Sequence, residues 1–188
     1  MGILKEPAAF IASLKLPKGF SVCDLGDQWM SDLTAPQIAS DWYRSIGCSR
    51  YESIDGNGRG TVTADLNLPL PLAVHTHGGF DLVTDFGTGE HVFDQAQVWR
   101  TMHGLVKPGG YIAFDRPAQG YQKHCYYLTN ECVFRDIARA NRYEVVWIDR
   151  ATRKRGELIR GVFRTQKGVS TTFCNPQQGK YLPDLVIR

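Results

Sequence analysis

The chain has 188 residues, of which 43% are hydrophobic and 22% are charged, and its formal net charge is +3. This length and balance suit one soluble globular domain with its own core, and so mild a charge does not by itself indicate binding to nucleic acid or membrane. Five cysteines without paired spacing do not form a disulfide framework, and no apolar run reaches the length of a membrane span, so we expect a cytoplasmic protein.

The chain begins with a short predicted helix within residues 1–18, which Pro17 and Gly19 end. Residues 19–167 form the predicted core and residues 168–188 a tail, all within a single domain. Further helices are expected after Thr34, Asp94 and Thr129, each of which can cap a helix. The sequence predicts strands over 20–25, 50–55, 61–66, 80–86, 111–115, 143–149 and 157–165, with apolar centres clearest in the first and the fourth.

The alternation of strands and helices predicts the fold class. Strands that alternate with helices form a parallel sheet covered on both faces. The last two strands are separated only by the basic turn 150–156, so they should pair antiparallel. We therefore expect a doubly wound, mainly parallel α/β sheet with helices on both faces and a C-terminal antiparallel strand hairpin.

An acid follows or ends each of five predicted strands, and in such sheets ligands bind beyond the carboxyl ends of the strands. A carboxylate such as Asp55 can accept both hydroxyls of a ribose, and Asp65 can accept from an adenine amine. Asp24 and Asp85 favour a nearby positive charge. The alternative is that such acids are turn residues or helix caps. The five acids at the predicted strand ends are Asp24, Asp55, Asp65, Asp85 and Asp115.

The segments "CDLG", "YESIDGNG", "TADLNLPLP", "FDLVTDFGTGEHV" and "LVKPGGYIAF" follow one another between residues 20 and about 165. This series resembles the class I S-adenosylmethionine-dependent methyltransferases. The resemblance implies that the cofactor is S-adenosyl-L-methionine, with Asp24 and Gly26 in a methionine-binding loop and Asp55 on the ribose. The full expected cofactor set is Asp24, Gly26, Gln28, Asp55, Gly56, Asn57, Asp65, Leu66, Asp85 and Phe86.

The turn after the first core strand departs from the pattern of this family, which has a second glycine where this chain has Gln28. Gln28 can offer an amide, and Trp29 either a face for a cation or ordinary packing. A nicotinamide-binding turn would need G-x-G-x-x-G, but Gln28 and Ser31 occupy its later positions, which argues against an oxidoreductase.

Methyl transfer to a hydroxyl or a protonated amine requires a base, unless positioning alone is enough. Among residues expected near the ligand, we expect His91 and His124 to be the bases, with Glu90 beside them. The alternative for each histidine is a structural hydrogen bond. Tyr121, Tyr126 and Tyr127 are expected to form an aromatic lid or to pack at the rim.

Two further patterns point to other ligands. His75 and His77 alternate, but no acid or cysteine stands near them and they precede a strand, so we expect no metal. The basic segment 150–167 leaves an anionic acceptor such as nucleic acid as an alternative, although a solvated hairpin is favoured.

The sequence thus predicts an S-adenosylmethionine-dependent methyltransferase with a small-molecule acceptor. The N-terminal helix, residues 116–128 and the tail from Thr171 are expected to set the specificity. The tail is apolar enough to pack on the domain or on a second subunit, which leaves a homodimer open. The alternatives are a non-catalytic S-adenosylmethionine-binding or interaction domain and, less favoured, the oxidoreductase.

Overall fold

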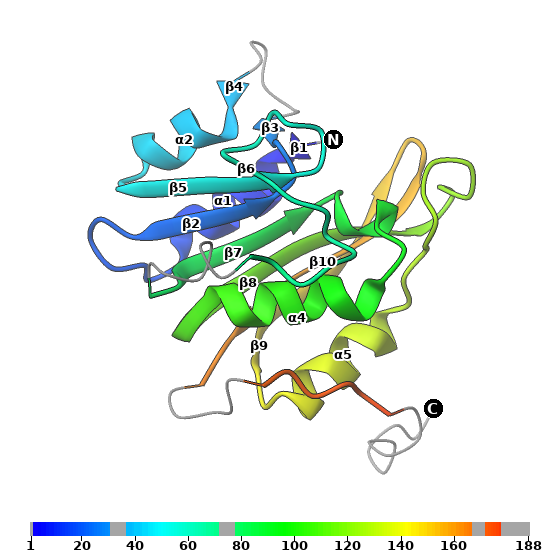
Figure 1. The fold of residues 1–188 in the computed structure, drawn as a ribbon. Helices are drawn as coiled ribbons and strands as arrows, with labels where there is room; N and C mark the ends of the chain where they lie inside the picture. Colours follow the sequence, from blue (N-terminus) through cyan, green and yellow to red (C-terminus); the bar gives the residue numbers. More distant parts are fainter. Residues whose placement is uncertain (1, 31–36, 72–77, 167–171, 178–188) are drawn as a thin grey trace.

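A seven-stranded sheet forms the centre of the protein in the computed structural model, which describes residues 2–30, 37–71, 78–166 and 172–177 (Figure 1). Its strand order is β6-β5-β2-β7-β8-β10-β9. The strands from β6 to β8 pair in parallel, whereas β10 runs antiparallel to both of its neighbours. The predicted fold class is therefore confirmed. The strands are β2 (Ser21–Leu25), β5 (Arg50–Asp55), β6 (Val62–Thr63), β7 (Phe80–Phe86), β8 (Val106–Gln119), β9 (Glu144–Arg153) and β10 (Gly156–Arg164).

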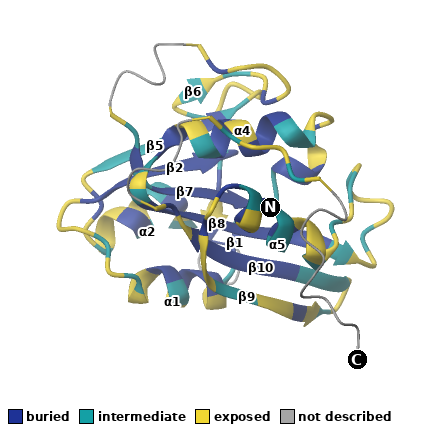
Figure 2. Ribbon diagram, turned by 90° about the horizontal axis from the view of Figure 1, so that it is seen from below, coloured by how far each residue is buried: buried dark blue, intermediate teal, exposed yellow. Residues whose placement is uncertain are grey.

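Helices cover both faces of the sheet. Helices α1 (Lys5–Ser13) and α2 (Ala39–Ser45) lie on one face, and α4 (Gln95–Leu105) and α5 (Glu131–Ala140) on the other. Side chains alternate along each strand, so Cys23 and Leu25 pack toward α4 and α5 while Val22 packs toward α1 and α2. Figure 2 shows the buried strands between the two layers of helices.

Several predicted elements have different bounds in the structure. Strands 50–55 and 80–86 are as predicted, but the strand predicted over 111–115 is the long β8. It starts earlier because Val106 pairs with Phe80 across a bulge formed by "KPGG", and it ends later because residues 116–119 pair with β10. The strand predicted over 61–66 shrinks to β6.

The helix caps were predicted with mixed success. Asp94 caps α4, since its side chain accepts from the Gln97 N–H. Asn130, and not Thr129, caps α5. The expected cap at Thr34 lies outside the described residues.

A small sheet that the sequence did not predict lies next to the carboxyl edge of the main sheet. It contains β1 (Gly2–Ile3), β3 (Trp29–Met30) and β4 (Gln37–Ile38), with β1 parallel and β4 antiparallel to β3. The chain leaving β2 therefore enters a strand instead of passing directly into a helix. This arrangement brings the N-terminal residues toward the ends of the central strands.

The described part of the tail, residues 172–177, packs on its own domain. Phe173 contacts the core beneath α4 and α5. Asn141 accepts from the Cys174 N–H at 2.8 Å and donates to the Cys174 carbonyl at 3.0 Å. The apolar residues beyond it that could contact a second subunit lie outside the described residues: Tyr181, Leu182, Leu185 and Val186.

The packing of α5 on the sheet gives a test of this core. Phe134 is 1% exposed and stacks on Phe114 with ring centroids 4.2 Å apart. We expect Phe134→Ala to lower the free energy of unfolding by about 3–5 kcal/mol, because it leaves a cavity. The neighbouring Val133, which is 40% exposed, provides the control: Val133→Ala should change it by less than about 0.5 kcal/mol. Equal effects of the two changes in urea unfolding would contradict this description of the core.

Candidate functional site

The ends of the parallel strands bring the predicted acids to one edge of the sheet. In the strand register, Leu25 lies beside both Ile54 and Asp85, and Phe86 lies beside Asp115. Three of the acids are therefore among the last two residues of their strands: Asp24, Asp55 and Asp85. Asp115 lies at the same level within the longer strand β8. This edge, at the arrowheads of β2, β5 and β7 in Figure 1, is the candidate site.

Two cavities open at this edge of the sheet. The smaller one, of about 410 Å³, lies at the ends of β5 and β6. The Asp55 carboxylate accepts from the Asp27 N–H through Oδ2 and from the Asn57 N–H through Oδ1, both at 2.9 Å. Asn57 does not line this cavity and shapes the turn instead. The backbone and side-chain donors of Asn67 hold the pKa of Asp65 below its usual range. The cavity is lined by Asp55, Gly56, Ala64, Asp65, Leu66, Thr88, His91 and Val92.

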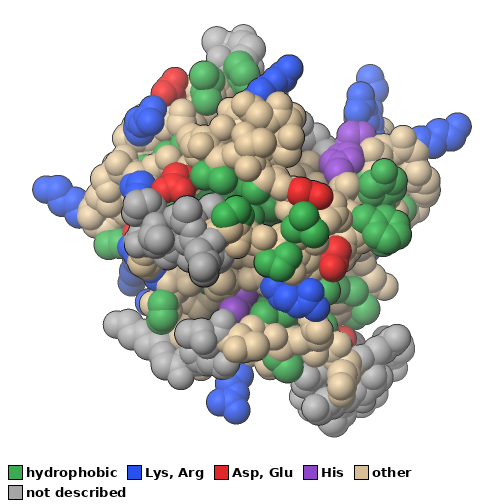
Figure 3. Space-filling view, in the orientation of Figure 1, with side chains coloured by type: hydrophobic (Ala, Val, Ile, Leu, Met, Phe, Trp, Pro, Cys, Tyr) green, Lys and Arg blue, Asp and Glu red, His purple; other side chains and the backbone are tan. Residues whose placement is uncertain are grey.

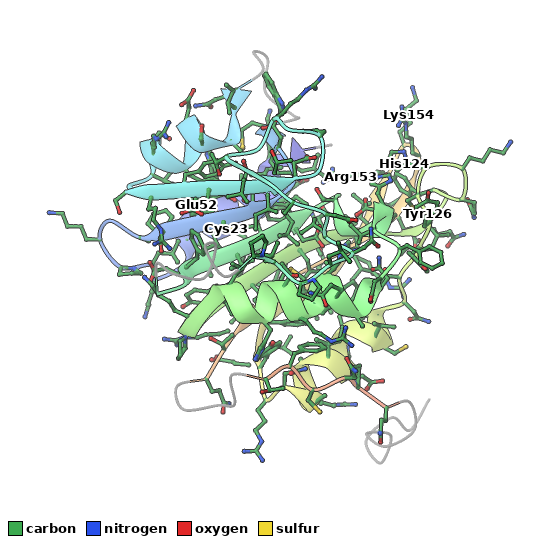
Figure 4. All side chains as sticks on the ribbon, viewed as in Figure 1. Cys23, Glu52, His124, Tyr126, Arg153 and Lys154 are labelled. Carbon is green, nitrogen blue, oxygen red and sulfur yellow. The ribbon has the colours of Figure 1, made fainter. Side chains whose placement is uncertain are left out.

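A larger cavity of about 640 Å³ lies at the ends of β7 and β8. The β9–β10 turn and the N-terminal residues complete it, and Figure 4 shows His124, Arg153 and Lys154 together at this end, far from Cys23 and Glu52. No residue of the described tail segment 172–177 lines it. The lining is Gly2, Leu4, Phe86, Gly87, Glu90, Asp115, Pro117, Tyr121, His124, Arg153, Lys154, Arg155 and Leu158.

The segment 86–92, which follows β7, lines both cavities. Thr88 and His91 line the smaller cavity, whereas Gly87 and Glu90 line the larger one. The segment therefore borders both cavities, which lie next to each other at this edge of the sheet.

Asp24 is fully buried and lines neither cavity among the described residues. It accepts hydrogen bonds from the hydroxyls of Thr84, Tyr43 at 3.2 Å and Tyr51 at 2.9 Å. Burial raises the pKa of Asp24 to about 7, although the three hydroxyls oppose this change. Its carboxylate therefore ties α2, β5 and β7 to β2, and a contact with a ligand stays a prediction.

Gln28 fills the space beside the single glycine of the turn. Gly26 has a φ of +85°, and a Cβ there would collide with Thr88 Oγ1. Gln28 Nε2 donates to the Leu25 carbonyl and to Thr88 Oγ1, both at 2.9 Å. Its Oε1 is buried and has no donor among the described residues. The adjacent Trp29 is 45% exposed, so core packing does not explain it.

Asp85 meets a cation that the sequence analysis did not single out. Arg116, which is 1% exposed, forms an ion pair with Asp85 Oδ2 and donates to Gln95 Oε1 at 3.2 Å. Asp85 Oδ1 accepts from the N–H groups of Thr88 and Gly89. The position of Arg116 directly after the acid that ends a predicted strand was the available signal. Asp85 thus holds the segment 86–92 in place.

The three predicted catalytic residues lie together. Glu90 is fully buried, and neither carboxylate oxygen has a hydrogen-bond donor among the described residues. Burial raises the pKa of Glu90 to about 7 against the opposing charge of Arg116, and it raises the pKa of Asp115 to about 7 as well. The rings of His91 and His124 are exposed, with centroids 5.0 Å apart. Burial of part of His91 and the neighbouring His124 lower the pKa of His91.

The three tyrosines of the loop after β8 have different surroundings. The Tyr121 ring lies 5.9 Å from the His124 ring and lines the larger cavity. Tyr126 is 72% exposed and lies farther out, against Phe93 (Figure 4). Tyr127 donates to the Phe93 carbonyl at 2.9 Å. Of the three, only Tyr121 lines the larger cavity.

The basic hairpin is largely neutralised by acids of the same chain. Arg150 pairs with Glu131 and Glu157, and Arg160 pairs with Asp149 at 3.0 Å. These ion pairs favour the solvated hairpin over a nucleic-acid surface. Three residues of this hairpin, Arg153, Lys154 and Arg155, line the larger cavity.

The remaining expectations concern a metal site at His75 and His77, the basic segment as far as Lys167, and membrane spans. His75, His77 and Lys167 lie outside the described residues. Across the ranges that the structure describes, no helix is both long and apolar enough to cross a membrane.

Comparisons with known proteins give structural matches alone, since no protein-family model and no curated protein matches the sequence. The structure is similar to the N-methyltransferase NodS from Bradyrhizobium japonicum WM9, with a TM-score of 0.60 and 16% identity over 87% of this chain and 96% of that one. It is also similar to the 1,6-didemethyltoxoflavin-N1-methyltransferase from Burkholderia thailandensis, solved with 1,6-didemethyltoxoflavin and S-adenosylhomocysteine. That match has a TM-score of 0.61 and 15% identity over 87% of this chain and 78% of that one. At such identities these matches show a common fold, which confirms the fold that the resemblance implied.

Replacing Asp24 tests its buried environment. Its pKa rises from 3.8 to about 7 on folding, so between these pH values the native state keeps a proton that the unfolded chain loses. Stability from this group is therefore lost as the pH rises through that window, by on the order of a few kcal/mol. We expect Asp24→Asn to remove this part of the decline in the free energy of unfolding, as measured by denaturant unfolding at several pH values. Asp41→Asn, at an exposed carboxylate, should not. Parallel wild-type and Asp24→Asn profiles would contradict the assignment.

Proposed function

We propose that this chain, which has the fold of the class I S-adenosylmethionine-dependent methyltransferases, binds S-adenosylmethionine and transfers its methyl group to a small molecule. One observation carries the proposal: the segment 86–92 lines two neighbouring cavities at the carboxyl edge of the sheet. Methyl transfer needs two ligands held in contact, and this edge is where doubly wound sheets bind them.

The smaller cavity suits the nucleoside half of the cofactor. Each Asp55 oxygen already accepts one backbone N–H, and its second lone pair remains for a ribose hydroxyl. Asp65 is placed to accept from the adenine amine, and the buried Leu66 offers an apolar contact to the base. These residues fit the role that the sequence assigned to them.

The turn around Gln28 is the proposed contact for the methionine half, although Gln28 is buried and lines neither cavity among the described residues. Its Oε1 is a buried acceptor with no donor in the described part of the chain, and such a group is costly unless something pairs with it. An α-ammonium group is a fitting donor.

The larger cavity is the proposed acceptor site. Its volume of about 640 Å³ is within the range of small-molecule sites. The bound cofactor supplies an electrophilic methyl group on a sulfonium. The chain orients the acceptor, excludes water with the loop that carries Tyr121, and offers Glu90 and His124 as groups that accept the acceptor's proton. His91 lines the smaller cavity, on the other side of the segment 86–92, and lies close to Glu90 and His124.

Three properties of the protein remain as parts of this proposal. All five cysteines are free, which suits a reducing compartment, so we place the activity in the cytoplasm. The single-domain division into residues 1–18, 19–167 and 168–188 and a homodimer through the tail stay predictions. A fold that binds the cofactor without catalysis is the second candidate, since Gln28 changes the turn.

Calorimetric titration with S-adenosylmethionine, S-adenosylhomocysteine and NAD tests the proposal. We expect both sulfur ligands to bind with a Kd on the order of micromolar and NAD not to bind. Asp55→Ala should weaken binding by about 10–100-fold, because it removes the acceptors for the ribose. Asp41→Ala is the matched control at an exposed carboxylate and should bind as the wild type does.

Circular dichroism must show that Asp55→Ala is folded, since Asp55 also holds the backbone of Asp27 and Asn57. Binding by the folded variant that equals that of the wild type would remove Asp55 from the site. Absence of binding by the wild-type protein would overturn the proposal as a whole.

The assignment of Gln28 predicts a difference between two ligands. Gln28→Ala should weaken S-adenosylmethionine binding by roughly tenfold or more, since a hydrogen bond to a charged group is lost. Binding of 5′-methylthioadenosine, which lacks the amino acid part, should stay within about twofold of the wild type. Equal losses for the two ligands, measured by the same titration, would show that Gln28 only shapes the turn.

A further inference from the structure

Three side chains on and beside the segment 86–92 have the chemistry of a metal site: Glu90 and His124 line the larger cavity, and His91 lines the smaller one. Glu90 and His91 are consecutive in the short helix η1 (Gly89–His91), and His124 comes from the loop after β8. One ligand atom from each of the three lies within 4.8 Å of the others. We propose that Glu90, His91 and His124 bind one divalent transition-metal ion.

The surroundings of Glu90 are a separate observation that points to a cation. Its side chain is fully buried, and both carboxylate oxygens lack a hydrogen-bond donor in the described part of the chain. A buried carboxylate without a donor is costly, and a metal ion coordinated by it removes that cost. The histidine rings lie above this buried group at the surface, where Figure 3 shows histidine side chains beside protruding Lys and Arg side chains.

The charge balance beneath the histidines also favours a cation. Asp85, Glu90 and Asp115 are buried, and Arg116 is the buried cation that acts on Glu90 together with the two aspartates. Arg116 pairs directly with Asp85 and leaves Glu90 unpaired among the described residues. Among the groups that act on Glu90 itself, carboxylates outnumber cations, while Arg153 and Arg160 act on Asp115.

Backbone hydrogen bonds hold the two segments of the site together. The Glu90 carbonyl accepts from the N–H groups of Tyr126 at 3.2 Å and Tyr127 at 3.3 Å. The His124 N–H donates to the Tyr121 carbonyl at 2.8 Å, which closes a turn around the histidine. These contacts fix the loop after β8 against η1, so the ligands are brought together before an ion binds.

The ligand types select the kind of ion. Two imidazoles and one carboxylate suit zinc or another first-row transition metal, whereas magnesium and calcium prefer oxygen ligands alone. Metal–ligand distances of about 2.1 Å place tetrahedral ligands about 3.4 Å apart. The exposed His91 and His124 side chains can close this difference by rotating. Three protein ligands leave a fourth position open.

The open position faces the larger cavity, which Glu90 and His124 line. An acceptor hydroxyl held there would be oriented, and its pKa lowered, by the ion, and the resulting alkoxide keeps a lone pair for attack on the methyl group. With the ion bound, Glu90 and His124 would serve as its ligands in place of accepting the acceptor's proton directly, and that proton would pass to water. This role rests on the proposed function, but ion binding itself does not.

The test uses the full chain, freed of metal with a chelator and titrated with Zn²⁺ by calorimetry and with Co²⁺ by visible absorption. We expect one ion per chain and the d–d bands of a Co²⁺ ion with nitrogen and oxygen ligands. Glu90→Gln and His124→Gln should each weaken Zn²⁺ binding by roughly 100-fold. His103→Gln is the control for losing an imidazole, because His103 lies on α4 and contacts Tyr143, away from the site. The Zn²⁺ affinity of this variant should equal that of the wild type.

Thermal unfolding confirms that each variant is folded before its affinity is compared. Zn²⁺ binding that is absent in the wild type, or that Glu90→Gln and His124→Gln leave unchanged, overturns the metal site. Titration with S-adenosylmethionine in the absence of metal keeps the two proposals separate. Zn²⁺ binding without cofactor binding would reject the proposed function alone, and cofactor binding without Zn²⁺ binding would reject the metal site alone.

Discussion

The parallel pairing of β5, β2, β7 and β8 is the constraint on which the rest of this structure depends. The register sets Leu25 beside Asp85 and Phe86 beside Asp115, so polar strand ends meet at one edge. A shift by one residue would turn each side chain to the opposite face and separate these groups. The two cavities and the segment that lines both follow from this register, because the segment 86–92 starts where β7 ends.

Burial of carboxyl groups gives that edge its chemistry. Asp24 is satisfied by three hydroxyls, and Asp85 is satisfied by Arg116. Glu90 has no such partner in the described ranges, and burial raises its pKa to about 7. The first two carboxylates stabilise the arrangement of strands and loops, whereas Glu90 is left for a ligand. Perturbed acids in a cavity are the usual physical sign of a functional site.

The success of prediction from sequence depended on how local the signal was. Strands 50–55 and 80–86 have bounds as predicted, because turn residues flank both strands and the second also has an apolar centre. The small sheet was missed, since two-residue strands such as β3 have no detectable period. In the site, Asp55, Asp65 and Leu66 line one cavity, and their contact with a cofactor stays a prediction. Arg116 and the hydroxyls around Asp24 were missed because their partners are distant in sequence.

The sequence by itself determined the fold class, the chain order of the strands and the set of acids that follow them. These properties depend on hydrophobic periodicity and on turn residues, which are local along the chain. Only the tertiary structure decided which acids are paired and which face a cavity, because pairing depends on groups brought together from separate strands. The same is true of Gln28 against Thr88 and of His124 against His91, whose contacts join segments that the chain order keeps apart.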